Sequence, residues 1–152
     1  YSHHPAATLP VRDNLGVKNR VIAGSGLCLE SPVPVLSPTV YAELNLQTAT
    51  TLLIPTEHAE RALYVLSGEA QLDGEALELN SLVVLPAGQE MTLFAESDCH
   101  AVLFGGAPLD GPRRINWNFV ASDPAAIDEA RRRWAVGDWP TVPGESERIE
   151  LP

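Results

Sequence analysis

The sequence lacks the features of a membrane protein or a nucleic-acid binder. No apolar run approaches the roughly 20 residues of a membrane-spanning helix, and the first residues show no basic segment followed by an apolar one. Basic residues are few: ten against twenty acidic ones give a formal net charge of -10, which repels phosphate backbones. We therefore expect no membrane partner, no direct nucleic-acid contact and a cytoplasmic location.

Cysteine is also scarce. Cys28 and Cys99 are the two present, and their spacing matches no metal-ligand motif, so we expect reduced thiols. By contrast, 13 prolines and 11 glycines are too many for a helical bundle and suit strands joined by turns. A chain of 152 residues is long enough for one domain with a sizeable core.

Short apolar segments separated by turn signals recur along the chain. Residues 39–46 alternate, with Val40, Ala42, Leu44 and Leu46 on one face. Residues 60–74 predict two strands with a break at Ser67-Gly68, followed by a turn at Asp73-Gly74. Further strand candidates are residues 20–24, 51–54, 76–79, 82–85, 91–95, 101–104 and 115–120. This spacing is typical of an antiparallel sandwich or barrel.

Residues 82–85, Leu-Val-Val-Leu, are apolar at every position. Such a pattern is expected for a strand that is covered on both faces. We therefore predict that this strand is buried on both sides.

One helix is expected near the C-terminus. Ser122 or Asp123 can cap it, with Pro124 in the first turn and Gly137 as a stop. A stripe formed by Ile127, Ala130, Arg131 and Trp134 gives it one apolar face, which we expect to pack outside the barrel. The predicted organisation is a lead-in or linker over residues 1–18, a barrel over 19–121, and a helix with a surface tail over 122–152 of the same domain.

Two motifs resemble those of the cupin superfamily of jelly-roll barrels. Gly68 matches the glycine of the first cupin motif, and Pro86-Ala87-Gly88 matches the turn of the second. Other residues occupy the positions of the family's metal ligands. Arg61 is at the glutamate position and Met91 at the position of the last histidine. The two alternating histidine positions fall either at Pro55 and Glu57 or at Ile54 and Thr56. Imidazole and carboxylate ligands suit iron, manganese or copper, and a guanidinium repels such a cation. We therefore predict no metal ligands and no catalytic residues.

A closer resemblance, over nearly the whole chain, is to the second half of pirin-family proteins. The residues that carry it are 60–68, 105–109, 116–120 and 142–152. Pirins are two-cupin proteins whose first barrel binds iron, and some are assigned a quercetin 2,3-dioxygenase activity. The resemblance implies an all-β, antiparallel jelly-roll (cupin) barrel with one C-terminal helix packed outside. It also implies that iron belongs only to an N-terminal cupin outside these residues.

Four residues are candidates for a cavity or ligand site: Arg61, His58, Met91 and His100. Arg61 should point into the barrel, where a charge must be paired or hydrogen-bonded. It could form a structural ion pair with Glu90 or Glu43, or it could hold a carboxylate ligand bidentately. The histidines have no partner at motif spacing, and Met91 can fill the space of a lost metal.

Three functions remain open at this stage. The chain could be a metal-free, non-catalytic cupin that serves as a structural or interaction partner, either of an iron-binding N-terminal cupin barrel of the same protein or of a second copy of this chain. It could instead be part of an iron-dependent, quercetinase-like enzyme whose active site lies in the other barrel. It could also be a small-carboxylate binding module centred on Arg61.

Overall fold

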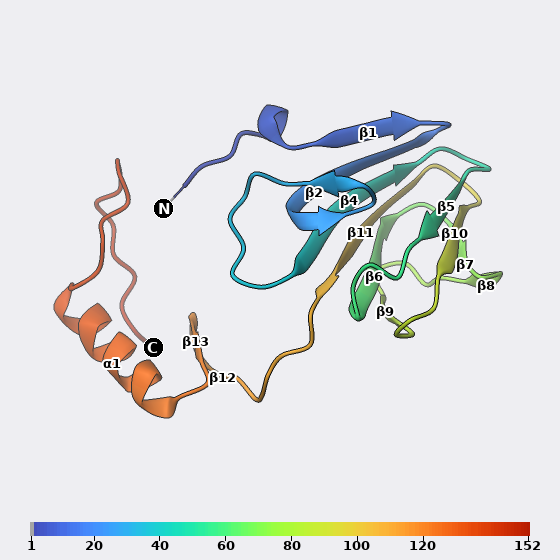
Figure 1. Ribbon diagram of the computed structural model, residues 1–152. Helices are drawn as coiled ribbons and strands as arrows, with labels where there is room; N and C mark the ends of the chain where they lie inside the picture. Colours follow the sequence, from blue (N-terminus) through green and yellow to red (C-terminus); the bar gives the residue numbers. More distant parts are fainter. Residues whose placement is uncertain (1) are drawn as a thin grey trace. The chain divides into compact units, whose positions relative to one another are not determined.

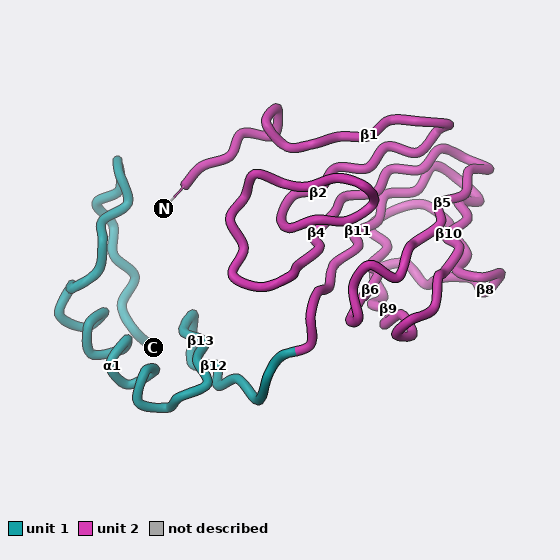
Figure 2. The backbone as a smooth tube through the Cα atoms, viewed as in Figure 1, with its two compact units in different colours: residues 1, 109–152 teal, residues 2–108 magenta. Residues whose placement is uncertain are grey.

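The computed structural model describes residues 2–152 and divides into two compact units (Figure 2). Ser2–Pro108 forms the β-rich unit, and Leu109–Pro152 belongs to the C-terminal unit. No helix in the part of the chain that the structure describes is long and apolar enough to cross a membrane.

The β-rich unit consists of two antiparallel sheets (Figure 1). A short 3-10 helix, η1 (Ala6–Thr8), precedes strands β1 (Val11–Asn14), β2 (Val17–Gly26), β3 (Leu29–Glu30), β4 (Thr39–Leu46), β5 (Thr51–Ile54), β6 (Glu60–Ser67), β7 (Ala70–Leu72), β8 (Glu75–Ala76), β9 (Leu82–Leu85), β10 (Met91–Ala95) and β11 (Cys99–Gly106). The seven-stranded sheet has the order β1-β2-β4-β11-β6-β9, with β3 paired to β2, and the four-stranded sheet has the order β5-β10-β7-β8. The predicted all-β antiparallel class is confirmed.

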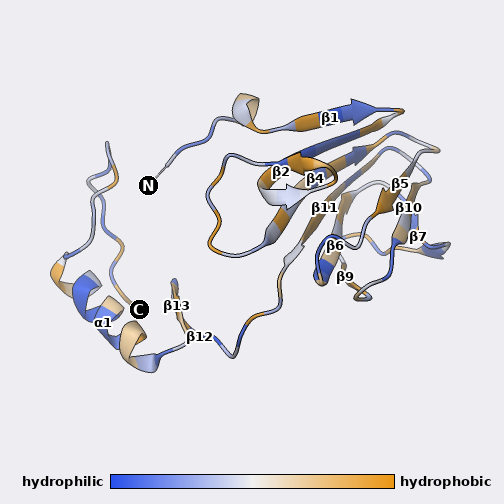
Figure 3. Ribbon diagram, viewed as in Figure 1, coloured by the Kyte–Doolittle hydropathy of each residue, from blue (hydrophilic) through white to orange (hydrophobic). Residues whose placement is uncertain are grey.

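The core lies between the two sheets. Leu44 and Leu63 enter it from the seven-stranded sheet, and Ile54 and Leu93 from the four-stranded sheet, all essentially fully buried. The alternation predicted for β4 is confirmed, since its even-numbered residues are buried and its odd-numbered ones are not. Both hydrophilic and hydrophobic segments occur along the strands of this sheet (Figure 3). Burying each such side chain contributes roughly 1.5–3 kcal/mol.

Four strands differ from the sequence-based expectation. β1 and the start of β2 lie inside residues 1–18, which were expected to be a lead-in, and β8 is limited to Glu75–Ala76. β9 is an edge strand, with Leu82 54% and Val84 73% exposed, so the prediction that it is covered on both faces is wrong. An apolar run shows that a strand favours burial, but it cannot show which neighbours are present to cover it.

The C-terminal unit contains strands β12 (Arg114–Asn116) and β13 (Phe119–Ala121), which pair with each other, and helix α1 (Pro124–Val136). The Asp123 carboxylate caps the helix by accepting a hydrogen bond from the backbone N–H of Ala125 at 2.9 Å. Gly137, with φ of 77°, closes the C-terminal end. Both predicted ends of the helix are confirmed, because the capping chemistry is local in sequence.

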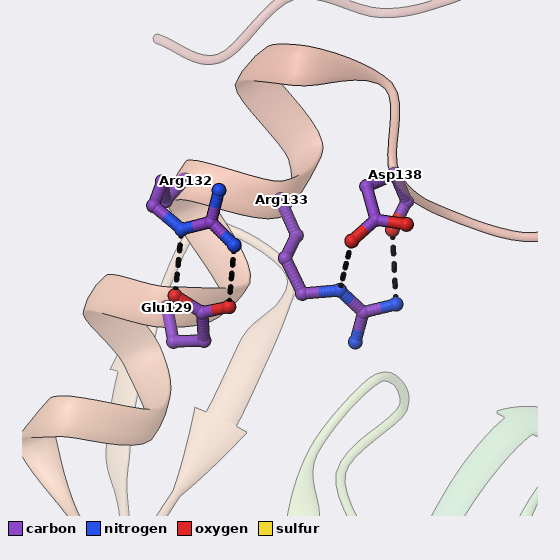
Figure 4. Close-up of polar contacts among 4 residues, drawn as sticks. All are labelled: Glu129, Arg132, Arg133 and Asp138. Atoms are coloured by element: carbon purple, nitrogen blue, oxygen red, sulfur yellow. Dashed lines mark hydrogen bonds and ion pairs between the residues drawn. The ribbon is translucent and has the colours of Figure 1, made fainter.

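The arginine run at residues 131–133 makes local contacts. Arg132 pairs bidentately with Glu129, and Arg133 pairs with Asp138 (Figure 4). The pairing lowers the pKa of Glu129, chiefly through the hydrogen bonds from Arg132. Arg131 instead donates to the side chain of Asn116 in β12. All three arginines therefore make hydrogen bonds within the C-terminal unit.

Aromatic side chains hold the C-terminal unit together. Trp117 and Phe119, at the β12–β13 turn, pack edge-on against Trp134 of α1, with ring centroids 5.1 and 6.3 Å away. Trp139 stacks on Phe119 at 5.8 Å. Through these contacts Trp117 and Phe119 anchor α1 and the segment that follows it. The packing of the α1 stripe on the barrel stays a prediction.

Candidate functional site

Arg61 enters the interior from β6, as predicted, and is only 3% exposed. Its Nη1 donates to the carbonyl of Pro55 at 2.6 Å, and its Nη2 donates to the carbonyls of Pro86 at 2.6 Å and Gln89 at 2.8 Å. The three carbonyls belong to the segment after β5 and to the turn between β9 and β10. One guanidinium therefore holds the ends of both sheets together.

The predicted ion pair of Arg61 with Glu90 or Glu43 is wrong. Glu90 is exposed, and both oxygens of Glu43 are engaged elsewhere: Oε2 with Arg20 at 2.8 Å and Oε1 with His100 at 3.1 Å. Arg61 instead uses backbone carbonyls, whose dipoles solvate a buried charge without a counter-ion. Within residues 2–152, its Nε has no hydrogen-bond partner.

His58 lies in the segment between β5 and β6 and is buried. Its Nε2 is 2.7 Å from the carbonyl of Ser25. The neighbouring Glu57, one of the positions considered for a metal ligand, accepts a hydrogen bond from the backbone N–H of Leu27 at 2.9 Å. Leu27 and Cys28 both have positive φ, so these contacts fix a tight turn between β2 and β3.

His100 lies on β11, away from Arg61. It pairs across the strand with Ser67, whereas Arg61 pairs with Gly105 at the opposite end of β11. His100 is about one third exposed and contacts Glu43 on the outer face of the seven-stranded sheet. The structure therefore does not bring His100 into a common site with Arg61.

Met91 begins β10, pairs with Ile54 and is 8% exposed. It lines a cavity of about 410 Å³ together with Leu72, Leu77 and Val83 at the open side of the two sheets. None of the described cavities is lined by the core residues Leu44, Leu63 or Leu93. Those residues belong to one cluster of buried apolar side chains.

The residues at the cupin ligand positions do not fit a transition metal. A fixed positive charge stands at the glutamate position, and Glu57 and Met91 contribute no imidazole. Within residues 2–152, no group of three or more His, Cys, Asp or Glu side chains is close enough together to hold a metal ion.

The fold and this altered ligand set define a cupin domain with a degenerate metal site. The family profile described as "Pirin C-terminal cupin domain" matches residues 41–140, and the chain belongs to the pirin family. A pirin-like protein from Caulobacter vibrioides is 37% identical over 138 residues, which are 90% of this chain and 48% of that protein. Pirin-1 of Arabidopsis thaliana is 25% identical over 139 residues, 86% of this chain and 48% of that protein.

A solved structure shows the same relationship. The crystal structure of a quercetin 2,3-dioxygenase from Acinetobacter baumannii superimposes with a TM-score of 0.80 at 31% identity, covering 95% of this chain and 50% of that one. The chain thus spans about half the length of the curated relatives it matches.

Sequence reasoning missed two carboxylates that organise loops. Glu57 holds the Leu27 turn, and Asp98 accepts hydrogen bonds from the backbone N–H and hydroxyl of Thr48 at 2.8 and 3.0 Å. The hydrogen bond from the Thr48 backbone is the main cause of a lowered pKa at Asp98. The partners in each pair, Glu57 with Leu27 and Asp98 with Thr48, are far apart in sequence. The one available signal was the presence of an acidic residue in a turn, and this does not identify its partner.

Proposed function

We propose that this chain is a metal-free, non-catalytic C-terminal cupin that acts as the structural partner of an iron-binding cupin barrel. The observation that carries the proposal is Arg61, which occupies the glutamate position of the cupin motif. Its guanidinium donates to three backbone carbonyls inside the barrel. The Arg61 guanidinium thus links the strand ends at a position where metal-binding cupins carry a metal ligand.

The electrostatics support this role. A divalent metal next to the guanidinium would meet like charge in a region of low dielectric, where repulsion is strong. Removing the guanidinium would break three hydrogen bonds from a charged donor to backbone carbonyls, and each loss costs free energy. The packed interior therefore depends on Arg61 rather than on an exchangeable ion.

Metal analysis of the purified chain tests the proposal. After incubation with Fe(II), Mn(II), Ni(II) or Cu(II) and desalting, we expect far less than one metal per chain, and no change in Tm on adding EDTA. The Arg61→Glu variant is the matched control, and it should also stay metal-free because the histidine positions are still unfilled. A stoichiometric metal in the wild-type chain would overturn the proposal.

A second candidate is that the chain forms part of a quercetin 2,3-dioxygenase whose iron lies in another barrel. The observation that favours it is the similarity to the Acinetobacter baumannii enzyme of that name, of which this chain covers 50%. Oxygen uptake with quercetin should then be absent from these 152 residues alone. Oxygen uptake by this chain after metal removal would contradict both candidates.

Binding of a small carboxylate by Arg61 stays a prediction. Three of the five guanidinium N–H donors are already directed at backbone carbonyls, and the side chain is only 3% exposed. A bidentate carboxylate would have to reach the two remaining N–H groups, on Nε and Nη1, in this buried position. The burial and the three existing hydrogen bonds therefore favour the structural role of Arg61 over a ligand-binding role.

A further inference from the structure

The face of the seven-stranded sheet that is turned away from the core carries a row of polar side chains. Strand pairing aligns one residue from each of β1, β2, β4, β11 and β6, in the order Asp13, Lys18, Asn45, His100 and Ser67. All five line one cavity of about 400 Å³, which we call the polar hollow. Its volume falls in the range of small-molecule sites, and neighbouring strands bring the side chains of such a row close together.

An irregularity in the pairing of β6 with β11 places Ser67 in this row. Val65 pairs with Ala101 of β11. Ser67 pairs with the preceding residue, His100, so Leu66 is an extra residue on β6. Strict alternation would have turned Ser67 toward the core together with Val65, yet Ser67 is exposed. Bulges often redirect a side chain next to a functional site, and this one adds a hydroxyl group to the polar hollow.

The imidazole of His100 is held in place from the neighbouring row of the sheet. Its Nε2 lies 3.1 Å from Oε1 of Glu43, and Oε2 of Glu43 accepts a hydrogen bond from Arg20 at 2.8 Å. Glu43 thus engages one ring nitrogen and leaves Nδ1 for another partner. A side chain that is oriented before a ligand arrives lowers the entropic cost of binding.

The loops around the polar hollow are fixed as well. The backbone N–H of Gln47 donates to the carbonyl of Gly16 at 2.8 Å, and both residues line the hollow. The carboxylate of Asp98, another lining residue, accepts hydrogen bonds from the backbone and hydroxyl of Thr48 at 2.8 and 3.0 Å. Hydrogen bonds therefore hold the loops that border the hollow.

The polar hollow offers both signs of charge side by side. Asp13 and Lys18 are cross-strand partners and both are exposed, yet no ion pair joins them within residues 2–152. Further along the row, the Asn45 amide, the second ring nitrogen of His100 and the Ser67 hydroxyl can each form a hydrogen bond. A fitting ligand carries one ammonium, one carboxylate and an uncharged polar group. Such a ligand has no net charge, so the net charge of -10 on the chain does not repel it.

We propose that the polar hollow binds a free α-amino acid with an uncharged polar side chain. The ammonium group lies against Asp13 and the carboxylate against Lys18, while the side chain extends along the row toward His100. Strands that are about 4.8 Å apart separate Lys18 from His100 by about 10 Å, which an amino acid the size of glutamine can bridge. The inference goes beyond the proposed structural role, because it concerns the outer face of the sheet and involves no metal.

NMR titration of the isotope-labelled chain with L-glutamine tests the inference. We expect saturable shifts of the backbone amide signals of Lys18, Asn45 and His100. Lys18→Gln and Asp13→Asn should each raise the Kd at least about tenfold, because each removes a charged hydrogen-bonding partner. Arg12→Gln is the matched control: it removes the same charge as Lys18→Gln from a neighbouring strand, but Arg12 does not line the polar hollow. It should leave the Kd within about twofold of the wild-type value.

Two analogues separate the contributions of the ligand's charges. Glutaramate lacks the α-ammonium group and γ-aminobutyramide lacks the carboxylate, so each should bind at least about tenfold more weakly than glutamine. Lys18 is the one lysine of the chain, so isotope-labelled methyl groups on its amine give a single lysine signal, which should shift in the same titration.

The amide spectra also show whether each variant is folded, which separates loss of binding from loss of structure. The absence of a saturable shift with glutamine in the wild type would overturn the inference. Equal binding of glutamine and either analogue would overturn it, and so would Kd values that Lys18→Gln and Arg12→Gln change to the same extent.

Discussion

The Nη2 atom of Arg61 lies 2.6 Å from the carbonyl oxygen of Pro86, which joins β6 to the turn after β9. In metal-binding cupins, a metal ligand is expected at the position of Arg61, and the Pro-x-Gly turn belongs to the second motif. Here the two motifs are connected directly by a side chain. Arg61 is part of the chain and is hydrogen-bonded to the turn. Unlike a bound metal ion, it therefore cannot be removed by a chelator.

Arg61→Met should lower the free energy of unfolding by about 3 kcal/mol, because it removes three charge-assisted hydrogen bonds made by a side chain that is only 3% exposed. Arg61→Lys should recover part of the loss, since an ammonium lacks the planar fork. Urea unfolding measures both. Arg20→Met is the control: this arginine is 31% exposed in its pair with Glu43, and its loss should cost less than about 1 kcal/mol. Equal losses at the two positions would contradict the role of Arg61.

Gly68, the glycine of the first motif, should not tolerate alanine. Its φ is 85°, and an added Cβ would lie 2.2 Å from the carbonyl oxygen of Asp98. Gly88 has φ of 70° with nothing within 4 Å, so Gly88→Ala should cost only the conformational penalty of about 1–2 kcal/mol. Gly68→Ala should cost at least about 3 kcal/mol by urea unfolding, because backbone atoms must move. If the two substitutions lowered the free energy of unfolding equally, the positive φ alone, and not the contact with Asp98, would determine the cost.

The stability of the fold should decrease at low pH because of Asp98. Hydrogen bonds from Thr48 hold its pKa below the ordinary value of 3.8. The ionised carboxylate therefore stabilises the fold above pH 3.8, and that contribution is lost as the pH falls through the lower folded-state pKa. Asp98→Asn keeps an acceptor without the charge, so Tm measured against pH should fall less steeply in this range. Curves of identical slope for wild type and variant would contradict the assignment.

The two thiols should differ in reactivity. Cys99 is 3% exposed at the start of β11, and burial raises its pKa, which suppresses the reactive thiolate. Cys28 is exposed. A thiol reagent should modify Cys28 quickly and Cys99 only when the protein unfolds. Cys28→Ser should therefore abolish the fast phase of the reaction. Two equal rates in the wild type would show that β11 opens more readily than its burial indicates.

Local patterns in the sequence were sufficient for several elements. β4 and β5 have the predicted bounds, and α1 begins after its Asp123 cap and ends at Gly137. These features depend on alternation and on capping residues within a few positions. The inward direction of Arg61 followed from the same alternation, because side chains separated by two positions share a face of the strand.

Long-range pairing could not be predicted in this way. The partners of Arg61 are backbone carbonyls, which every residue possesses, so no sequence pattern singles out Pro55, Pro86 or Gln89. The contact of Glu43 with His100 likewise requires β4 and β11 to be neighbours. Strand order determines such contacts, and residues far apart in the chain meet only after the sheet has formed.

By itself, the sequence determined the all-β class, the capped helix and the replacement of the cupin ligands, since each of these depends on residue type and short-range spacing. The tertiary structure decided which faces are covered. β9 reads as a fully buried strand, yet its place at the edge of the sheet leaves Leu82 and Val84 exposed. An apolar side chain favours burial, but only the packing of neighbouring elements determines whether it is buried.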